Sequence, residues 1–299
     1  MTAAVHARWV HLAAAGATLA VVAWRVGTGP FLDGLRAVDG GALAAGSGIA
    51  VLTTVCCAWR WKTVSRGLGV DPPLGPAVAA YYRSIFLNVT LPGGVVGDVH
   101  RGISQGRDTS DVGRGLRGVA WERSAGQAVQ VVLTVAVLLL LPSPVRAVVP
   151  LAALALLVAA AVALAAVSRF SRLRGAVARD VRDGLLAARA WPAIALASAL
   201  VVAGHAVTFM IAARTAGVTA PLSQMLPLAM LVLLAAALPN VGGWGPREGV
   251  TAWAFAAAGL GASLGVATAV VYGVMVFVAS LPGAAVLVAA WLRPGAAHV

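Results

Sequence analysis

The sequence predicts an all-α integral membrane protein, a polytopic helical bundle with about eight crossings and one or two broken, re-entrant helices. Of its 299 residues, 60% are hydrophobic and only 11% are charged, and the mean hydropathy is +0.90. A soluble globule of this length would need more polar residues to cover its surface. Several apolar blocks reach the roughly 20 residues that a helix needs to cross a bilayer. Two similar phrases interrupt them in opposite halves, which indicates a possible internal pseudo-repeat.

The basic charge and the two cysteines exclude several classes of protein. The formal charge of +12 comes from short loops between apolar blocks, as is typical of cytoplasmic loops beside anionic lipid. A nucleic-acid-binding protein would carry its basic residues as a stripe on a soluble face, so we expect no nucleic-acid partner. Cys56 and Cys57 are adjacent in an apolar run, which fits neither a disulfide framework nor a zinc site. We expect neither a metal nor a cofactor.

The apolar blocks predict a single transmembrane domain over 1–299, with a first half at about 1–145 and a second half at about 190–299. No clean cleavage site follows the first apolar run, so we expect it to be a retained helix rather than a signal peptide. The predicted crossings lie at about 9–24, 41–59, 117–141, 147–167, 193–213, 222–238, 248–261 and 265–291.

Two basic segments mark the cytoplasmic side. The run Arg60-Trp61-Lys62 follows the second predicted helix, and its mixture of basic and tryptophan side chains is typical of a membrane interface. The segment 168–191 contains six arginines spaced among apolar residues. It predicts either a solvated cytoplasmic loop or a basic amphipathic helix on the inner leaflet.

The block at about 76–97 is too polar and too broken for contact with lipid. It contains Arg83 and Asn88 and ends in a proline and three glycines. If this block crossed the membrane, the arginine-rich loops at 60–75 and 98–117 would face opposite sides. A re-entrant excursion places both loops in the cytoplasm, in keeping with the rule that cytoplasmic loops are basic. We predict this re-entrant course and cytoplasmic termini.

The predicted helix 117–141 carries a polar stripe. The stripe consists of Arg123, Gln127, Gln130 and Thr134, with Glu122 beside it. Spacings of four, three and four residues place the stripe on one helical face. Inside a membrane such a face must meet protein or water. Hydrogen bonds that hold the bundle together are one interpretation, and the lining of a cavity is the other, favoured by an arginine together with a glutamate.

The two interrupting phrases run from Leu91 to Arg101 and from Leu238 to Glu248. Each contains Leu-Pro, then glycines, then an arginine with an acid nearby. Glycine lets the backbone approach a head group closely, helix-terminal and loop amides bind anions, and arginine offers a donor fork suited to phosphate. Broken helices in transporters meet near the middle of the membrane, with the site between the repeats. We therefore predict that Arg101 and Arg247 converge on one cavity.

These phrases, together with Glu122-Arg123 and the later Leu281-Pro282-Gly283, resemble the signatures of the lysylphosphatidylglycerol synthase transmembrane family. The resemblance covers nearly the whole chain. Members of this family include the flippase region of multiple peptide resistance factors. The resemblance implies lipid translocation or lipid handling by a multi-pass protein of the plasma membrane in the bacterial envelope. It does not imply aminoacyl transfer, which belongs to a separate soluble domain in bifunctional members.

The expected function is that of a flippase or scramblase for an anionic phospholipid or a polyprenyl-phosphate-linked lipid, without enzymatic activity. Arg101 and Arg247 would hold phosphate, each oriented by the acid of its own phrase, and Glu122-Arg123 would line the path. The complete set of predicted substrate-binding residues is Arg83, Asn88, Gly93, Gly94, Asp98, Arg101, Glu122, Arg123, Gly243, Trp244, Arg247 and Glu248.

Glu122 and Glu248 are the only glutamates of the chain, and we predict that each lies near an arginine. A lone carboxylate at membrane depth would be costly. Adjacent residues on a helix do not face each other, so Glu122 should reach an arginine of another segment. Arg101 or Arg247 is the expected partner.

Two alternatives remain open, a membrane-embedded enzyme acting on a lipid-linked phosphate or sugar, and a non-catalytic partner of an envelope-lipid enzyme. The sequence has no Asp-x-Asp pair, His-Glu-x-x-His motif, Gly-x-Ser-x-Gly elbow or Walker loop, and His100 is the only acid–base candidate. The expected partners are the membrane and a lipid with an anionic head group. A homo-oligomer or a complex with an envelope-biosynthesis enzyme is also possible.

Overall fold

The computed structural model describes residues 28–147, 149–151, 175, 177–238, 240 and 244–292. Its elements over these residues are all helices, which confirms the predicted all-α bundle. The crossing expected at 9–24 lies outside the described residues. So do nearly all of the crossing expected at 147–167 and part of the basic segment 168–191.

The two halves of the described chain repeat one order of helices: long, short, short, long. In the first half these are α3 (Gly40–Gly67), α4 (Leu74–Thr90), α5 (Val96–Asp108) and α6 (Val112–Leu140). In the second half they are α9 (Trp191–Thr215), α10 (Leu222–Ala236), α11 (Pro246–Ala257) and α12 (Ala262–Trp291). The flanking elements are α2 (Gly29–Ala37) and the π-helical η1 (Asp180–Leu185). The repeated order is what a pseudo-repeat predicts.

Within the described chain, α3, α6, α9 and α12 are long and apolar enough to cross a membrane. The short helices α10 and α11 have 15 and 12 residues, or lengths of about 22 and 18 Å at the rise of an α-helix. The hydrocarbon core is roughly 30 Å thick. The full crossings expected at 222–238 and 248–261 are therefore replaced by a second helical hairpin. Among the described residues, Gly245 precedes α11 with a φ of +132°, which is outside the helical region, and Pro246 begins that helix.

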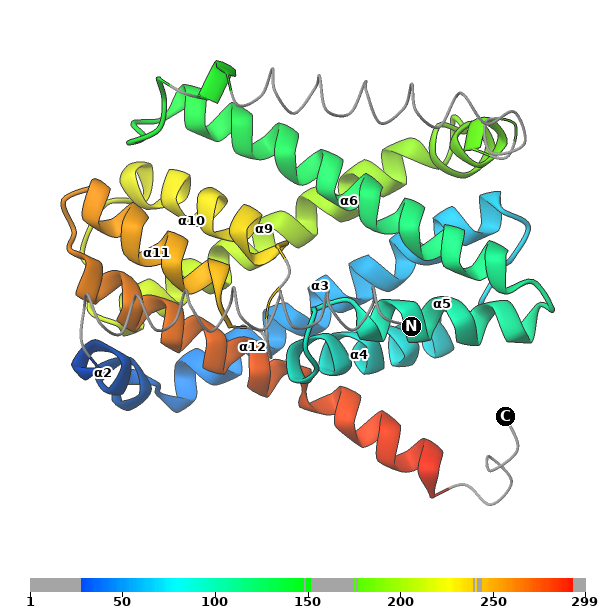
Figure 1. Cartoon of the computed structure of the whole chain (residues 1–299), viewed down its shortest axis with the longest axis horizontal. Coiled ribbons are helices and arrows are strands. Elements are labelled where there is room, and N and C mark those ends of the chain that lie inside the picture. The colour runs from blue at the N-terminus through cyan, green and yellow to red at the C-terminus, as the bar shows by residue number, and fades with distance from the viewer. Residues whose placement is uncertain are drawn as a thin grey trace, which may run out of the picture.

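The two hairpins, α4–α5 and α10–α11, approach each other with their loops in the middle of the molecule (Figure 1). The backbone N–H of Gly93 in the first loop donates a hydrogen bond to the carbonyl of Asn240 in the second, at 2.8 Å. Gly93 and Gly94 have φ angles of +102° and +67°, a region that glycine adopts without strain. The two Leu-Pro phrases thus meet, as the sequence predicted.

The first hairpin begins and ends at the same end of the bundle. The turn 68–73 before α4 and the turn 109–111 after α5 both lie at the right of Figure 1. This geometry agrees with the expectation that the arginine-rich loops around them share one side. The hairpin covers 74–108, which is longer than the predicted block at 76–97, because α5 continues as a regular helix to Asp108.

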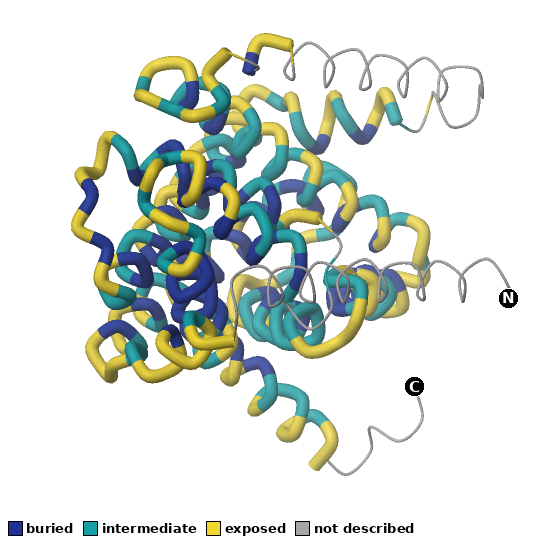
Figure 2. Tube along the Cα trace, turned by 60° about the vertical axis from the view of Figure 1, so that its left-hand side comes forward, coloured by how far each residue is buried: buried dark blue, intermediate teal, exposed yellow. Residues whose placement is uncertain are grey.

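Burial divides the long helices into inner and outer ones. In the apolar window of α12, 61% of the residues are buried, against 11% in that of α6. Accordingly, α12 packs against both halves, including α3, α4, α9 and α11, and Figure 2 shows the buried residues gathered inside the bundle. Among the four long helices of the described residues, α6 is therefore the least buried.

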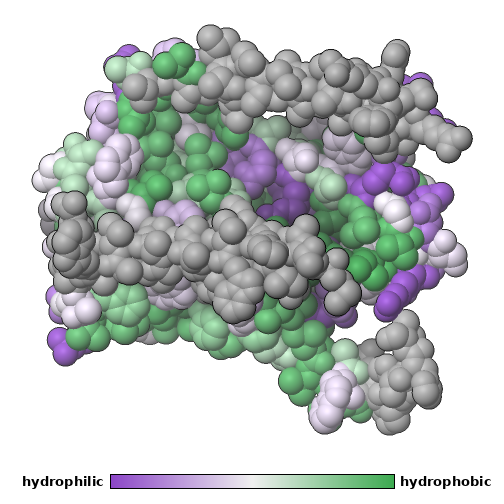
Figure 3. All heavy atoms as spheres, viewed as in Figure 1, coloured by the Kyte–Doolittle hydropathy of each residue, from purple (hydrophilic) through white to green (hydrophobic). Residues whose placement is uncertain are grey.

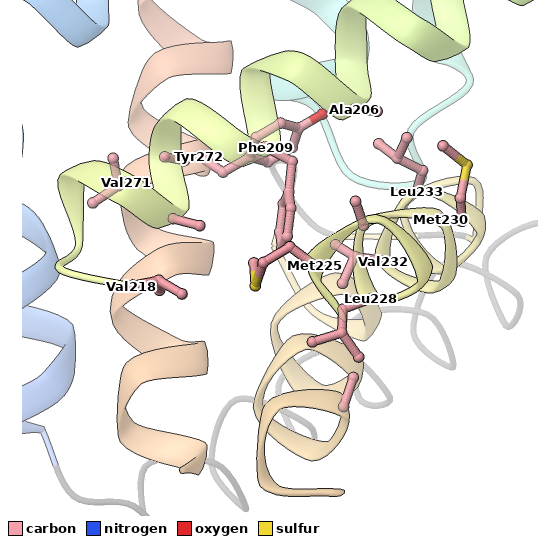
Figure 4. Packing of buried hydrophobic residues seen from close by; sticks show 14 of the residues in the cluster. Ala206, Phe209, Val218, Met225, Leu228, Met230, Val232, Leu233, Val271 and Tyr272 are labelled. Carbon is pink, nitrogen blue, oxygen red and sulfur yellow. The ribbon is translucent and has the colours of Figure 1, made fainter. Parts of the chain in front are cut away.

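The main apolar core belongs to the second half (Figure 4). Phe209 of α9, Met225 and Leu228 of α10, and Tyr272 of α12 are all buried there, and the rings of Phe209 and Tyr272 lie 5.8 Å apart between centroids. The first half has a smaller apolar cluster, which includes Trp61 and Tyr81, and it also buries several charged side chains.

Candidate functional site

A cavity of about 570 Å³ lies where the two hairpins meet. Its size is typical of a pocket for a small molecule. Both halves contribute to its wall. The polar and charged lining residues include Arg60, Asn88, Asp98, Arg123, Gln127, Gln130, Ser198, His205, Asn240 and Arg247, and the apolar and aromatic ones include Ile85, Val89, Val202, Leu233, Trp244, Tyr272, Val276 and Phe277. Figure 3 shows hydrophilic side chains near the middle of a largely hydrophobic face.

Glu122 is the centre of a buried ion-pair network behind the cavity wall. Its side chain has no exposed surface. Arg60 of α3 donates to it from Nε at 2.8 Å and also from Nη2. Arg101 of α5 donates from Nη2 at 3.1 Å, and Tyr81 of α4 donates its hydroxyl at 3.0 Å. One carboxylate therefore joins α3, α4, α5 and α6, which confirms that Glu122 pairs with arginines of other segments.

Arg101 is fully buried between aromatic rings. Its guanidinium lies 4.5 Å from the ring centroid of Trp61 and 4.1 Å from that of Tyr81, and its Nη2 bridges Asp98, at 2.9 Å, and Glu122. Its Nε and Nη1 are buried without a hydrogen-bond partner among the described residues. Arg101 therefore bridges two carboxylates and stacks on two aromatic rings.

Asp98 connects this network to the cavity. Its carboxylate accepts hydrogen bonds from Ser84 Oγ at 3.1 Å, Asn88 Nδ2 at 2.7 Å, Arg101 Nη2 at 2.9 Å and Arg123 Nη1. The amide oxygen of Asn88 accepts the backbone N–H of Gly97 at 2.8 Å, at the start of α5. Asn88 therefore links the two helices of the hairpin and also orients Asp98. This explains the polar residues that made the block unsuitable for lipid.

Arg60 is a site residue that the sequence interpretation missed. We expected it at the cytoplasmic interface, but α3 continues to Gly67 and buries both Arg60 and Trp61. Arg60 lines the cavity and donates from Nη1 to Ser198 of α9 at 3.0 Å. A signal existed, because Thr53, Cys57, Arg60 and Val64 repeat the four, three, four spacing of the α6 stripe.

In the second half, Arg247 and Glu248 form a pair at the start of α11. Glu248 accepts the backbone N–H of Gly245 at 2.6 Å and Arg247 Nε at 2.8 Å. Adjacent helical residues usually point apart, but here the glutamate turns back to the first free N–H of the helix and reaches its neighbour. Glu248 is therefore held near an arginine, as predicted. The Arg247 guanidinium lies 5.8 and 5.2 Å from the ring centroids of Trp244 and Tyr272.

The predicted convergence of Arg101 and Arg247 on one cavity does not match the geometry. Arg247 lines the cavity, whereas the Arg101 side chain has no exposed surface and does not belong to the lining. The cause is the buried Glu122, which draws Arg101 behind the wall. The arginines of the first half that reach the cavity are Arg60 and Arg123.

The polar stripe of α6 lines the cavity over three of its four positions. Arg123, Gln127 and Gln130 belong to the wall, while Thr134 is buried elsewhere. The side chain of Arg123 is 35% exposed although it pairs with Asp98. The interpretation as a cavity lining is therefore confirmed for these three residues.

The other predicted residues fall into three groups. Gly94 and Trp244 line the cavity, and Gly93 lies outside the lining and contacts the second loop through its N–H. Arg83 is half-buried outside the lining. Gly243 lies outside the described residues. The exposed His100 does not reach the cavity either, and the described residues form no cluster of three or more side chains able to hold a metal ion.

Replacing Gly97 with alanine should destabilise the first hairpin by about 1–3 kcal/mol, the usual cost of overpacking. A Cβ atom there would overlap the backbone carbonyl of Ser84, across the hairpin. Gly75→Ala on α4 is the matched control, since nothing lies within 4 Å of its added Cβ. Thermal unfolding in detergent measures both variants. Equal stability of the two would show that this close approach is unimportant.

The chain matches one protein family and none of the curated proteins with which it was compared. The family is described as the transmembrane region of lysylphosphatidylglycerol synthase, and its model matches residues 8–283.

Proposed function

The chain belongs to the family of lysylphosphatidylglycerol synthase transmembrane regions, and from this we propose that it is a multi-pass plasma-membrane protein that moves a lipid with an anionic head group across the bilayer. The observation that carries the proposal is the cavity between the two hairpins, which combines arginines with apolar walls. An anionic head group needs the arginines, and the acyl chains can lie against the apolar walls. No chemical change of the lipid is part of the proposal.

The charge of the site favours an anion. It contains the arginines Arg60, Arg101, Arg123 and Arg247 against the carboxylates Asp98, Glu122 and Glu248, which leaves one formal positive charge in excess. Within the described residues, Nε and Nη2 of Arg123 and Nη1 of Arg247 make no hydrogen bond. A phosphate could accept from these free donors. Such charge-assisted hydrogen bonds are stronger in a site of low dielectric constant.

The cavity between the two hairpins is the proposed route for the lipid. We propose that both are re-entrant and that they meet near the middle of the membrane, as in transporters built from broken helices. The loops contact each other through the backbone hydrogen bond from Gly93 to Asn240.

Re-entrance of α4–α5 predicts that both ends of this hairpin are labelled from one side of the membrane. Val70→Cys and Asp108→Cys, each in a Cys56→Ser/Cys57→Ser background, should react with an impermeant maleimide from the cytoplasmic side. Ser263→Cys, at the start of α12 and at the other end of the bundle (Figure 1), should react from the outside. Labelling of positions 70 and 108 from opposite sides would rule out re-entrance.

Reconstitution tests the proposed movement of lipid. Liposomes that contain the purified protein and fluorescent phosphatidylglycerol should lose protection of the inner leaflet from an impermeant quencher, while protein-free liposomes retain it. Mass spectrometry of the same lipid should show no new product. A modified lipid would favour the membrane-embedded enzyme instead. Intact lipid that stays in its leaflet would favour the non-catalytic partner.

A further inference from the structure

We propose that the cavity selects a head group that carries a phosphate and hydroxyl groups but no ammonium group. This inference rests on the proposed function and names the substrate class of the same site. It differs from what the family description suggests, because a lysyl ester of phosphatidylglycerol carries ammonium groups. The inference depends on which polar groups of the wall are already engaged and which are free.

An ammonium group would find no free carboxylate in the described wall. Asp98 is the carboxylate that lines the cavity, and four donors, including two arginines, already occupy it. A carboxylate offers about four acceptor positions, so Asp98 is saturated. Glu122 and Glu248 lie outside the lining and are committed to arginines. A bound ammonium would have to break one of these pairs.

The aromatic rings of the wall are engaged in the same way. Tyr81 stacks on Arg101, and both Trp244 and Tyr272 lie beside Arg247. An aromatic face attracts a cation, but a second cation there would be repelled by the arginine already present. Of the rings in the described lining, Phe277 is left without such a neighbour. The described wall therefore offers an ammonium group no free carboxylate, and Phe277 is its one aromatic ring without a neighbouring arginine.

Hydrogen-bonding groups without charge are, by contrast, free. Gln127 and Gln130 line the cavity and make no side-chain hydrogen bond within the part of the chain that the structure describes. Each amide can both donate and accept, which is what a hydroxyl group requires. A membrane helix tolerates such amides where they meet protein, water or a ligand. Two adjacent free amides indicate a ligand with several hydroxyl groups.

The positions along α6 fit one head group. Arg123, Gln127 and Gln130 share a helical face, and the rise of 1.5 Å per residue places the last about 10 Å from the first. A phosphate at Arg123 would thus be followed by hydroxyl groups at the two amides. Glycerol, inositol or a sugar attached to a phosphate has this sequence of groups. The apolar part of the lining favours a lipid over a soluble phosphate as their carrier.

A comparison of translocation rates among lipids with different head groups tests the inference. Proteoliposomes would contain labelled phosphatidylglycerol, phosphatidic acid or lysylphosphatidylglycerol, and the initial rate of translocation would be compared. We expect phosphatidylglycerol to move fastest and the lysyl lipid slowest. The variant Gln127→Leu/Gln130→Leu should lower the preference for phosphatidylglycerol over phosphatidic acid roughly tenfold, the effect of two lost neutral hydrogen bonds. Ala128→Leu, at an exposed position on the same helix, is the control and should leave it unchanged.

The outcomes separate this inference from the function on which it rests. Equal or faster movement of the lysyl lipid, or an unchanged preference in the double variant, would overturn the head-group assignment while lipid movement stands. If no lipid moves, the proposed function fails. Thermal stabilisation by soluble glycerol 3-phosphate, lost in the double variant, would then still support the head-group chemistry. Absence of that stabilisation would overturn the assignment as well.

Discussion

Replacing Glu122 with glutamine should lower the free energy of unfolding in detergent by about 3–5 kcal/mol, the range found when one partner of a buried ion pair is removed. The substitution leaves Arg60 without its carboxylate partner and removes one of the two that Arg101 contacts. Both guanidiniums are buried, so water cannot replace the lost interactions. The NH2 group of the glutamine would also replace a carboxylate oxygen, and it would face the hydrogen-bond donors of the neighbouring side chains.

The control for this prediction is an ion pair that water already screens. Asp71 accepts from Lys62 and Arg66 at the end of the bundle, where its side chain is 52% exposed. Surface pairs contribute little to stability, so Asp71→Asn should unfold close to the parental temperature. A double-mutant cycle adds a second check. If Arg60→Gln and Glu122→Gln had strictly additive effects, the two residues would not be coupled and the network would have no special role.

Replacing Arg123 with glutamine should slow lipid translocation by about 10- to 100-fold, the effect of losing one hydrogen bond to a charged group. Arg123 has two donating nitrogens without a partner among the described residues and lies in the wall of the cavity. Its partial exposure means that the replacement should change stability much less than that of Glu122. Lysine keeps the charge but not the planar fork, so Arg123→Lys should give an intermediate rate.

Arg117→Gln is the matched control, because Arg117 lies on the same helix and pairs with Asp180 at 2.9 Å, outside the cavity lining. The rate of translocation in proteoliposomes and the melting temperature should be measured for the same preparations. Parental rates in both Arg123 variants would remove the anion-binding role. A similar loss in Arg117→Gln would show that arginines at the membrane surface limit transport instead.

The position of Arg101 changes one expectation. The sequence interpretation assigned it to phosphate, which implies that Arg101→Lys impairs transport and leaves stability intact. Its guanidinium is fully buried against two aromatic rings and two carboxylates. Lysine cannot reproduce the flat stacking surface or the bridge. The main effect of this substitution should therefore be a loss of stability.

The sequence by itself determined the class of the fold and several residues of the site. Hydrophobic blocks can be recognised in the sequence because every membrane crossing needs a similar length and must satisfy its backbone hydrogen bonds internally. The same constraint made Asp98, Glu122 and Arg123 conspicuous, since charged residues at this depth need partners. The break of each half at Leu-Pro and the glycines was also visible, because these residues act through local backbone chemistry.

Only the tertiary structure decided which arginine meets which acid and which of them reaches the cavity. Arg60 and Arg101 both contact Glu122, although 62 and 21 residues of sequence separate them from it. The helical spacing around Arg60 defines a face of α3 but does not show whether that face is covered, because this depends on the packing of α4, α6 and α9 against it. Burial is a property of the packed bundle, and in the packed bundle Glu122 holds Arg101 behind the wall while Arg123 remains in the cavity.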